Sequence, residues 1–219
     1  MKIQKGLIVS CQAEEGSLFN TPESIVNFAV EAEKGGAVGV RIRDVENVYQ
    51  VSKKVSIPIM GLSKSTYKDG TVWITPSYLT AKDLSDVGAD FIAMDATGRE
   101  GYYDIVKASN NNNMKIIGDI SHISQAEKAI KSGCVGLTTA LSGYTLECDV
   151  NMEEPDFDLL QELISHFPKI PIMAEGRYWE REQVKRAFDM GANNVVIGSA
   201  ITRPYLITKR FQQTLKTNK

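Results

Sequence analysis

Two ionisable residues follow apolar, proline-led segments at widely separated places in the chain. Lys64 comes after residues 58–63 (PIMGLS), and Glu175 comes after residues 171–174 (PIMA). Both segments are typical of buried β-strands, so each side chain is expected just beyond the end of a strand. If the two strands belong to one barrel, Lys64 and Glu175 reach the same rim. An amine and a carboxyl group in one water-poor pocket are the minimum needed to remove a proton from carbon and to return one.

Burial would adapt both groups to this chemistry. Desolvation lowers the pKa of a lysine toward the range of a useful base, and it raises the pKa of a carboxyl group so that the group stays protonated as an acid. A surface position is the alternative for Lys64, but its place directly after an apolar strand favours the pocket. We therefore predict that Lys64 and Glu175 form a catalytic pair.

Glycine-rich segments near the end of the chain indicate an anion site. Residues 175–177 (EGR) and 198–204 (GSAITRP) follow the last two expected strands. Glycines allow a backbone to approach an oxyanion, a serine adds a hydroxyl group, and a helix N-terminus adds unpaired N–H donors. Glycines that only make tight turns are the alternative, but nearby arginines favour phosphate. The residues predicted to hold it are Gly176, Arg177, Gly198 and Ser199.

Other polar residues follow the remaining strands. Arg41 stays protonated, so we interpret it as a substrate-binding or orienting cation rather than a base. Arg43 faces either the site or solvent. Asp95 and Asp119 either take part in catalysis or orient their neighbours, and the sequence favours neither role.

The elements that must position these residues form a repeating pattern. Apolar strands are expected over residues 6–11, 37–41, 57–62, 90–95, 115–119, 135–138, 170–174 and 194–197. They are continuous rather than alternating in hydrophobicity, which indicates a parallel sheet covered on both faces. Amphipathic helices lie between them; one is expected to begin at a Ser124 cap and run to Gly133. Residues 63–76 form a long insert, with an extended piece over 72–75.

Several helices end in glycine followed by a small residue that enters the next strand, and this repeat indicates β/α units. Counting them predicts eight units and therefore a single (β/α)8 TIM barrel over residues 1–219, with phosphate-binding loops after the seventh and eighth strands. An open, doubly wound sheet is the rival fold, but it usually needs fewer strands for this length.

Composition narrows the class of protein. The net charge is −2 with both signs scattered, so nothing suggests a partner that is nucleic acid or membrane. No signal peptide or membrane span is expected. Cys11, Cys134 and Cys148 are expected to be reduced thiols in a cytoplasmic protein. His122 and His166 lack the partners of a metal site, and no metal is predicted.

A series of short motifs runs in order from the first strand to the last helix. They are residues 6–12 (GLIVSCQ), 35–41 (GGAVGVR), 74–76 (ITP), 94–97 (MDAT), 118–121 (GDIS), 141–145 (LSGYT), 174–177 (AEGR) and 198–204 (GSAITRP). Each motif is weak alone, but together and in this order they are highly specific. The chain resembles the N-acetylmannosamine-6-phosphate 2-epimerase family over nearly its whole length.

The resemblance implies an isomerase that interconverts N-acetylmannosamine 6-phosphate and N-acetylglucosamine 6-phosphate, a step of bacterial sialic acid catabolism. It implies catalysis without a cofactor and a homodimer. It assigns catalysis to Lys64 and Glu175, with substrate contacts from Gln12, Arg41, Asp119, Tyr144 and Arg203 and phosphate around Gly176, Gly198 and Ser199. Residues 64–67 (KSTY) and 138–140 (TTA) depart from the family pattern, which leaves loop detail and sugar contacts open.

The implied chemistry sets requirements on the site. Inverting C2 of an open-chain sugar needs a base on one face, an acid on the other and a cation near the enolate oxygen. We expect Lys64 to remove the proton and Glu175 to deliver one, with the roles exchanged in the reverse reaction. Arg41 and Asp119 would position the sugar, and Asp119 is a candidate to assist ring opening.

Two other classes remain alternatives. One is a different sugar-phosphate barrel, such as a ribulose-phosphate epimerase or an indole-pathway synthase, although a metal-dependent pentose epimerase needs more histidine ligands. The other is a regulatory barrel that binds a phosphorylated metabolite and controls transcripts. It would keep the phosphate loops but would not need Lys64 and Glu175, and it should have a basic surface.

Overall fold

Eight parallel strands close into a barrel at the centre of the molecule. A computed structural model describes residues 4–145 and 150–215. The barrel strands are β1 (Gly6–Cys11), β2 (Gly39–Arg43), β3 (Ile59–Leu62), β6 (Phe91–Asp95), β7 (Ile116–Asp119), β8 (Gly136–Thr138), β9 (Ile172–Glu175) and β10 (Asn194–Ile197). They are ordered β1-β10-β9-β8-β7-β6-β3-β2 around the closed ring. The predicted (β/α)8 TIM barrel is therefore confirmed.

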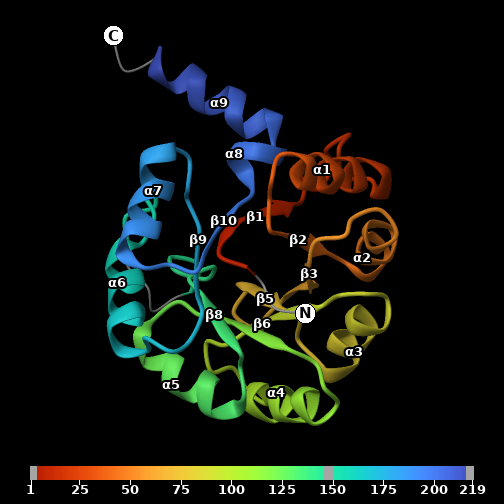
Figure 1. Ribbon diagram of the computed structural model, residues 1–219, viewed down its shortest axis with the longest axis vertical. Helices are drawn as coiled ribbons and strands as arrows, with labels where there is room; N and C mark the ends of the chain where they lie inside the picture. The colour runs from red at the N-terminus through yellow and green to blue at the C-terminus, as the bar shows by residue number, and fades with distance from the viewer. Residues whose placement is uncertain (1–3, 146–149, 216–219) are drawn as a thin grey trace.

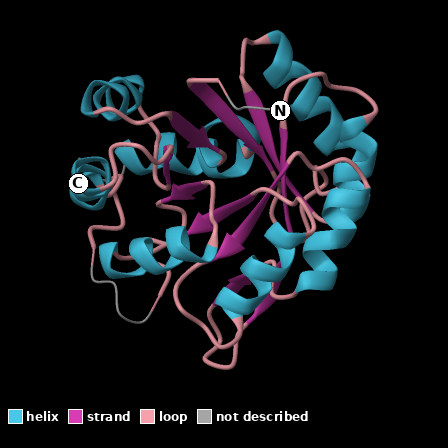
Figure 2. Cartoon of the chain, turned by 60° about the horizontal axis from the view of Figure 1, so that its bottom comes forward, coloured by secondary structure: helices cyan, strands magenta, loops and turns pink. Residues whose placement is uncertain are grey.

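Helices surround the barrel on its outer side. They are α1 (Pro22–Lys34), α2 (Val45–Ser52), α3 (Tyr78–Asp86), α4 (Tyr102–Asn111), α5 (Ile123–Ser132), α6 (Phe157–His166), α7 (Arg181–Met190), the short α8 (Ser199–Thr202) and α9 (Pro204–Thr214). Figure 1 shows α1 to α7 arranged around the strands, with α9 extending away from that ring. In Figure 2 the strands cross the middle of the molecule and the helices lie outside them.

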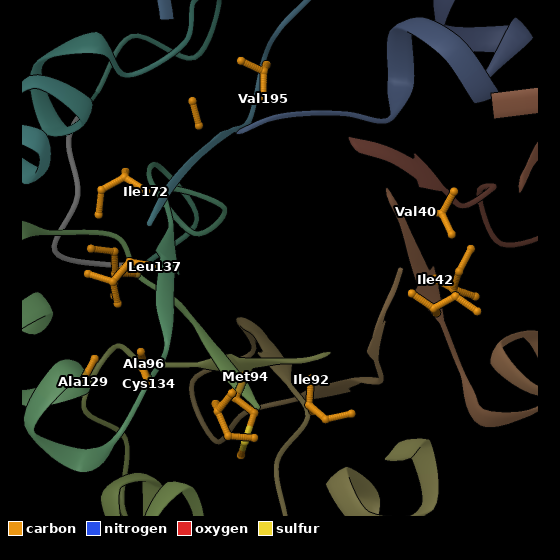
Figure 3. Packing of buried hydrophobic residues seen from close by; sticks show 14 of the residues in the cluster. Val40, Ile42, Ile92, Met94, Ala96, Ala129, Cys134, Leu137, Ile172 and Val195 are labelled. Carbon is orange, nitrogen blue, oxygen red and sulfur yellow. The ribbon is translucent and has the colours of Figure 1, made fainter. Parts of the chain in front are cut away.

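Alternate strand residues build two apolar layers. One layer lies between the barrel and the helices and includes Val40, Ile42 and Val195 (Figure 3). The other fills the barrel and includes Met60 and Met173. Successive side chains of a strand point to opposite faces, so residues two positions apart share a face. A polar residue two positions after an apolar residue of the inner layer therefore also points into the barrel.

Helix ends follow the sequence signals in most places. The Thr21 side chain caps α1 by accepting from the backbone N–H of Ser24, and Asp156 caps α6 in the same way. The Ser124 cap predicted for α5 is wrong. His122 is the N-cap, and its ring nitrogen accepts from the backbone N–H of Ser124. Histidine is not among the preferred capping residues, which is why the pattern pointed to the serine.

The long insert contains more structure than predicted. Lys64 begins strand β4 (Lys64–Thr66), which pairs with β5 (Val72–Ile74) in an antiparallel hairpin outside the barrel. The extended piece over residues 72–75 matches β5, but β4 and the short helix α8 were not predicted from sequence.

The structure of the described residues also bears on disulfides, membrane spans and metal sites. Cys11 and Cys134 are buried and unbridged, while Cys148 lies outside the described residues. No helix within residues 4–145 and 150–215 has the length and apolar character needed to cross a membrane. No group of three or more His, Cys, Asp or Glu residues in those ranges is arranged to hold a metal ion.

Candidate active site

Strand parity brings Lys64 and Glu175 to the barrel interior. Met60 belongs to the apolar layer inside the barrel, and so does Leu62. Lys64 continues this alternation just beyond β3. On β9, Met173 is an inner residue and Glu175 follows two positions later at the end of the strand. Both ionisable groups therefore arise from the same geometric rule, applied to two different strands.

A cavity of about 580 Å³ opens at the carboxyl ends of the strands. It brings together all the residues predicted for the site, which are Gln12, Arg41, Lys64, Asp119, Tyr144, Glu175, Gly176, Arg177, Gly198, Ser199 and Arg203. The barrel converges these side chains from segments that are far apart in sequence. Their individual roles stay predictions.

Lys64 and Glu175 reach the cavity from widely separated parts of the barrel rim. Strands β3 and β9 are four positions apart in the closed ring whichever way the strands are counted. The lysine and the carboxyl group are close enough to influence each other's ionisation. A small molecule between them would therefore have an amine on one side and a carboxyl group on the other.

Arg41 joins two carboxylates at the base of the cavity. Its guanidinium donates to both oxygens of Asp119, at 2.6 and 3.2 Å, and its Nη1 lies 3.3 Å from Glu175 Oε2. Thr138 Oγ1 also donates to Asp119, at 2.9 Å. The Arg41 and Asp119 side chains are almost fully buried. Burial alone would lower the pKa of Arg41, but Asp119 and Glu175 raise it, so the guanidinium stays charged.

The cavity shifts the pKa values of its two acid–base candidates in opposite directions. Lys64 is exposed along the cavity mouth, yet the surrounding walls displace enough water to lower its pKa to about 8, and the charges of Arg41, Arg203 and Arg43 act in the same direction. Burial raises the pKa of Glu175 to about 7, against the charge of Arg41. Near neutral pH each group is thus close to exchanging its proton, as an acid–base catalyst requires.

The residues predicted to bind phosphate follow the ends of β9 and β10. Gly176 has a φ of 106°, a conformation that favours glycine, and it lies at the end of β9. A Cβ atom at Gly198 would lie 3.3 Å from the Cβ of Ser10, so a larger residue there would crowd strand β1. Ser199 follows and begins α8. The backbone here is compact and lies beside Arg203 in the cavity wall.

Comparison with known proteins identifies the family of the chain. The family described as "Putative N-acetylmannosamine-6-phosphate epimerase" matches residues 25–217. The chain belongs to this family.

Individual relatives match over almost their full length. A protein of Clostridioides difficile (strain 630), named "Putative N-acetylmannosamine-6-phosphate 2-epimerase", is 36% identical, with 99% of each chain covered. One of the same name from Caldanaerobacter subterraneus is 39% identical, covering 98% of this chain and 93% of the relative. A solved structure of the N-acetylmannosamine-6-phosphate 2-epimerase from Clostridium perfringens has a TM-score of 0.91 at 34% identity, covering 97% of this chain and 94% of that one.

Arg177 makes its hydrogen bonds to other loops of the chain. It lines the cavity, but its side chain donates to the backbone oxygens of Glu154 and Ser142, each at 2.6 Å, and to the Ser142 hydroxyl. Its donors therefore fasten the loop after β8 to the loop after β9. Tyr144, a predicted substrate contact, lies in the fastened loop. Contact of Arg177 with phosphate stays a prediction.

Two other residues considered for the site, Asp95 and Arg43, are not among the residues that line the cavity. Asp95, for which the sequence leaves catalysis and orientation of neighbours equally open, accepts from Thr97 and lies 3.2 Å from the guanidinium of Arg99. Arg43 pairs with Asp44 at the rim.

Some residues of the cavity wall were missed from sequence. Trp179, Met152 and Leu206 line the cavity. The position of Trp179, four residues after Glu175 in the same rim loop, was the available signal for it. Gln12, which was predicted, is held in place by a 2.8 Å hydrogen bond from its amide to the Ser10 hydroxyl.

Proposed function

We propose that this chain interconverts N-acetylmannosamine 6-phosphate and N-acetylglucosamine 6-phosphate by removing and returning the proton at C2. The proposal is supported by one cavity that both Lys64 and Glu175 line, with β3, which leads to Lys64, and β9, which ends at Glu175, four positions apart in the ring. Inversion at a carbon requires proton removal from one face and delivery to the other, and two groups facing each other across a small cavity meet that requirement.

Proton transfer begins when the sugar is in its open-chain form. The C2 proton is then acidic because the adjacent aldehyde accepts the electron pair as an enolate. Neutral Lys64 takes this proton and becomes an ammonium ion. Protonated Glu175 gives its proton to the opposite face of C2 and becomes a carboxylate. The resulting charge state is the one that starts the reverse reaction, so the two residues exchange roles with direction.

Arg41 and Asp119 position the sugar in this proposal. The guanidinium is buried, permanently charged and held by two hydrogen bonds to Asp119, which makes it a fixed positive charge at the base of the cavity. A preorganised cation stabilises negative charge that develops on an enolate without a reorganisation cost. Asp119 is also placed at the cavity wall, where it could accept or return a proton during ring opening.

Phosphate binding anchors the other end of the substrate. Gly176, Gly198, Ser199 and Arg203, the residues proposed to hold the phosphate, all line the cavity. Anchoring a group that doesn't react orients C2 between the two acid–base residues, and such orientation contributes on the order of 7–11 kcal/mol to lowering a barrier.

The wider setting of the proposal follows from the family. The reaction is a step of amino-sugar and sialic acid catabolism, carried out in the cytoplasm by the whole chain acting as one domain. No cofactor is required, because the aldehyde of the substrate already makes the C2 proton acidic. We also propose a homodimer. Three apolar residues, Tyr205 and Phe211 of α9 and Leu215 just beyond its end, support an interface at that helix, since each is 68% or more accessible.

The test is solvent exchange at C2 measured by NMR in D2O. Wild-type protein with N-acetylmannosamine 6-phosphate should form N-acetylglucosamine 6-phosphate that carries deuterium at C2. Lys64→Ala should abolish this uptake while sugar-phosphate binding survives in calorimetry. Undiminished exchange in Lys64→Ala would remove the lysine from the mechanism. Wild-type binding without exchange would instead favour the regulatory alternative.

A further inference from the structure

Lys64 belongs to a small hairpin that follows barrel strand β3 and lies outside the barrel. Strand β4 begins at Lys64, and Lys64 is paired with Ile74 of β5. Three-residue strands in a two-stranded sheet are marginal on their own in water. The position of Lys64 therefore depends on what holds the hairpin against the barrel.

The base of the hairpin is held by Ser63 and Thr75. The Thr75 N–H donates to the Ser63 carbonyl at 3.0 Å, and the Ser63 N–H donates to the Thr75 hydroxyl at 3.1 Å. Thr75 is 1% exposed and has a φ of 47°. A β-branched residue in this region is strained, so the surrounding packing enforces the turn at this end.

The far end of the hairpin is held by Arg99, from the loop after β6. Its Nη2 donates to the Thr71 hydroxyl at 2.6 Å, and its guanidinium lies 4.2 Å from the centre of the Tyr67 ring. Tyr67 in turn packs edge-on against Trp73, with ring centres 5.0 Å apart. One cation thus contacts the hairpin through both a hydrogen bond and an aromatic face.

Arg99 is itself fixed to the barrel by Asp95. Its Nε lies 3.2 Å from Asp95 Oδ2, and the two side chains are 7% and 0% exposed. The other oxygen of Asp95 accepts from the backbone N–H and the hydroxyl of Thr97. Asp95 ends β6, so the ion pair connects a barrel strand directly to the tip of the hairpin.

The connection between the barrel and the hairpin includes a buried ion pair, Asp95–Arg99, which packing alone would not require. A buried ion pair is expensive to desolvate, and apolar residues of similar volume often stabilise a fold better. The Asp95–Arg99 pair is separate from the hydrogen bonds that Arg41 makes to Asp119. It contacts instead the hairpin that carries Lys64. A directional, two-sided contact defines the hairpin position more closely than apolar contact would.

We propose that Arg99, held by Asp95, is a positioning residue that keeps the β4–β5 hairpin closed and so holds Lys64 over the cavity opposite Glu175. The inference rests on the proposed function of Lys64 as the base. The closed hairpin also accounts for the environment of Lys64, since Val72 and Ile74 of β5 line the same cavity. When the hairpin opens, the amine gains water and moves away from Arg41, Arg203 and Arg43, the cations that act on it.

Arg99→Met tests the role with two independent readouts. The first is the pH dependence of Lys64 acetylation by acetic anhydride, followed by peptide mass spectrometry, which needs no turnover. The half-labelling pH should move from about 8 toward the ordinary lysine value of 10.5. The second is kinetics with N-acetylmannosamine 6-phosphate. Misplacement by about 1 Å can cost 10²-fold in rate, so kcat should fall by up to about 100-fold while KM changes little.

Two further variants separate positioning from stability. Thr71→Val removes the hydroxyl that accepts from Arg99 and that also donates to Asp69 Oδ1 within the hairpin turn, so Asp69→Asn is its control. Thr71→Val should shift both readouts in the same direction as Arg99→Met but by less, Asp69→Asn should shift neither, and this pair decides the matter if Arg99→Met does not fold. Arg99→Lys keeps the charge, so its Lys64 labelling midpoint and its kcat should lie between those of Arg99→Met and the wild-type protein. The matched control is Arg186→Met, which removes an arginine 3.9 Å from the Phe157 ring on an outer helix and should move neither readout.

The outcomes are distinct. A labelling midpoint and kcat that stay at wild-type values in folded Arg99→Met would overturn the positioning role. Equal effects of Arg99→Met and Arg186→Met would do the same, because they would indicate general destabilisation. Failure of the wild-type protein to epimerise the sugar phosphate would count against the proposed function, while the labelling experiment would still decide whether Arg99 controls Lys64.

Discussion

Arg41 and Asp119 meet across the barrel through two hydrogen bonds, although their strands are not neighbours. Strands β3 and β6 lie between β2 and β7 in the ring. The guanidinium donates to both carboxylate oxygens at 2.6 and 3.2 Å, and both side chains are almost fully buried. A two-pronged pair of this kind fixes the orientation of each partner. The charge that Arg41 presents to Glu175 therefore has one defined position.

The first prediction concerns removal of this cation. Arg41→Met should destabilise the protein by about 3–5 kcal/mol, because it leaves Asp119 and Glu175 buried without their positive partner. Arg41→Lys should be less destabilising but should still lower kcat by about 10²–10³-fold, because an ammonium cannot reproduce the two-pronged contact. Urea unfolding and steady-state kinetics measure the two effects.

Arg43→Met is the matched control for Arg41. Arg43 lies on the same strand two residues further along, but its side chain is 29% exposed and pairs with a half-exposed Asp44. Such a pair contributes about 0–1 kcal/mol. If Arg41→Met lowered the free energy of unfolding in urea no more than Arg43→Met, the contacts of Arg41 with Asp119 and Glu175 would contribute little to stability.

The parity of the strands explains why much of the site could be predicted from sequence. Apolar residues at Met60 and Leu62 require Lys64 to continue on the same inner face, and Met173 does the same for Glu175. The direction in which each side chain leaves its strand depends on local period and on closure of the barrel. The fold and the cavity residues that were predicted follow from the same two rules.

Contacts made by long side chains between loops could not be predicted in this way. Arg99 and Thr71 are 28 residues apart, and nothing in their spacing indicates that they touch. The three donors of Arg177 point to loop carbonyls and a hydroxyl, while the motif around it suggested phosphate. In both cases the partner is set by how neighbouring loops pack on the finished barrel, which local pattern does not encode.

The second prediction is a bell-shaped dependence of kcat/KM on pH. The productive form has neutral Lys64 and protonated Glu175. As pH falls, Lys64 also gains a proton and cannot act as a base; as pH rises, Glu175 loses its proton and cannot act as an acid. Burial raises the pKa of Glu175 to about 7, and desolvation lowers that of Lys64 to about 8, so the maximum should lie between these values. The two limbs belong to the pair rather than to single residues.

Glu175→Gln tests this assignment. Glutamine keeps the shape but cannot donate the proton, so epimerisation should fall by about 10²–10⁴-fold. Proton exchange by Lys64 alone, followed with C2-deuterated substrate in H2O, should survive with a single limb that rises with pH. A bell that persists unchanged in this variant would mean that another group supplies the acid.

The third prediction concerns phosphate recognition by Arg203. Arg203 lines the cavity between α8 and α9, and its Nε lies 3.5 Å from Glu14 Oε1. The phosphate is remote from C2, so loss of its contact weakens binding of the ground state and the transition state together. A hydrogen bond to a charged group contributes about 1.5–3 kcal/mol, so Arg203→Ala should raise KM by roughly 10- to 100-fold with a much smaller loss of kcat.

Inorganic phosphate provides a second measurement for the same residue. It should inhibit the wild-type protein competitively, and Arg203→Ala should weaken this inhibition in parallel with the rise in KM. The control is Lys185→Ala, which removes an exposed cation of α7 that pairs with Asp189 and should leave both constants unchanged. A loss confined to kcat in Arg203→Ala, with phosphate inhibition intact, would assign Arg203 to the chemical step, because only an interaction made in the transition state produces that pattern.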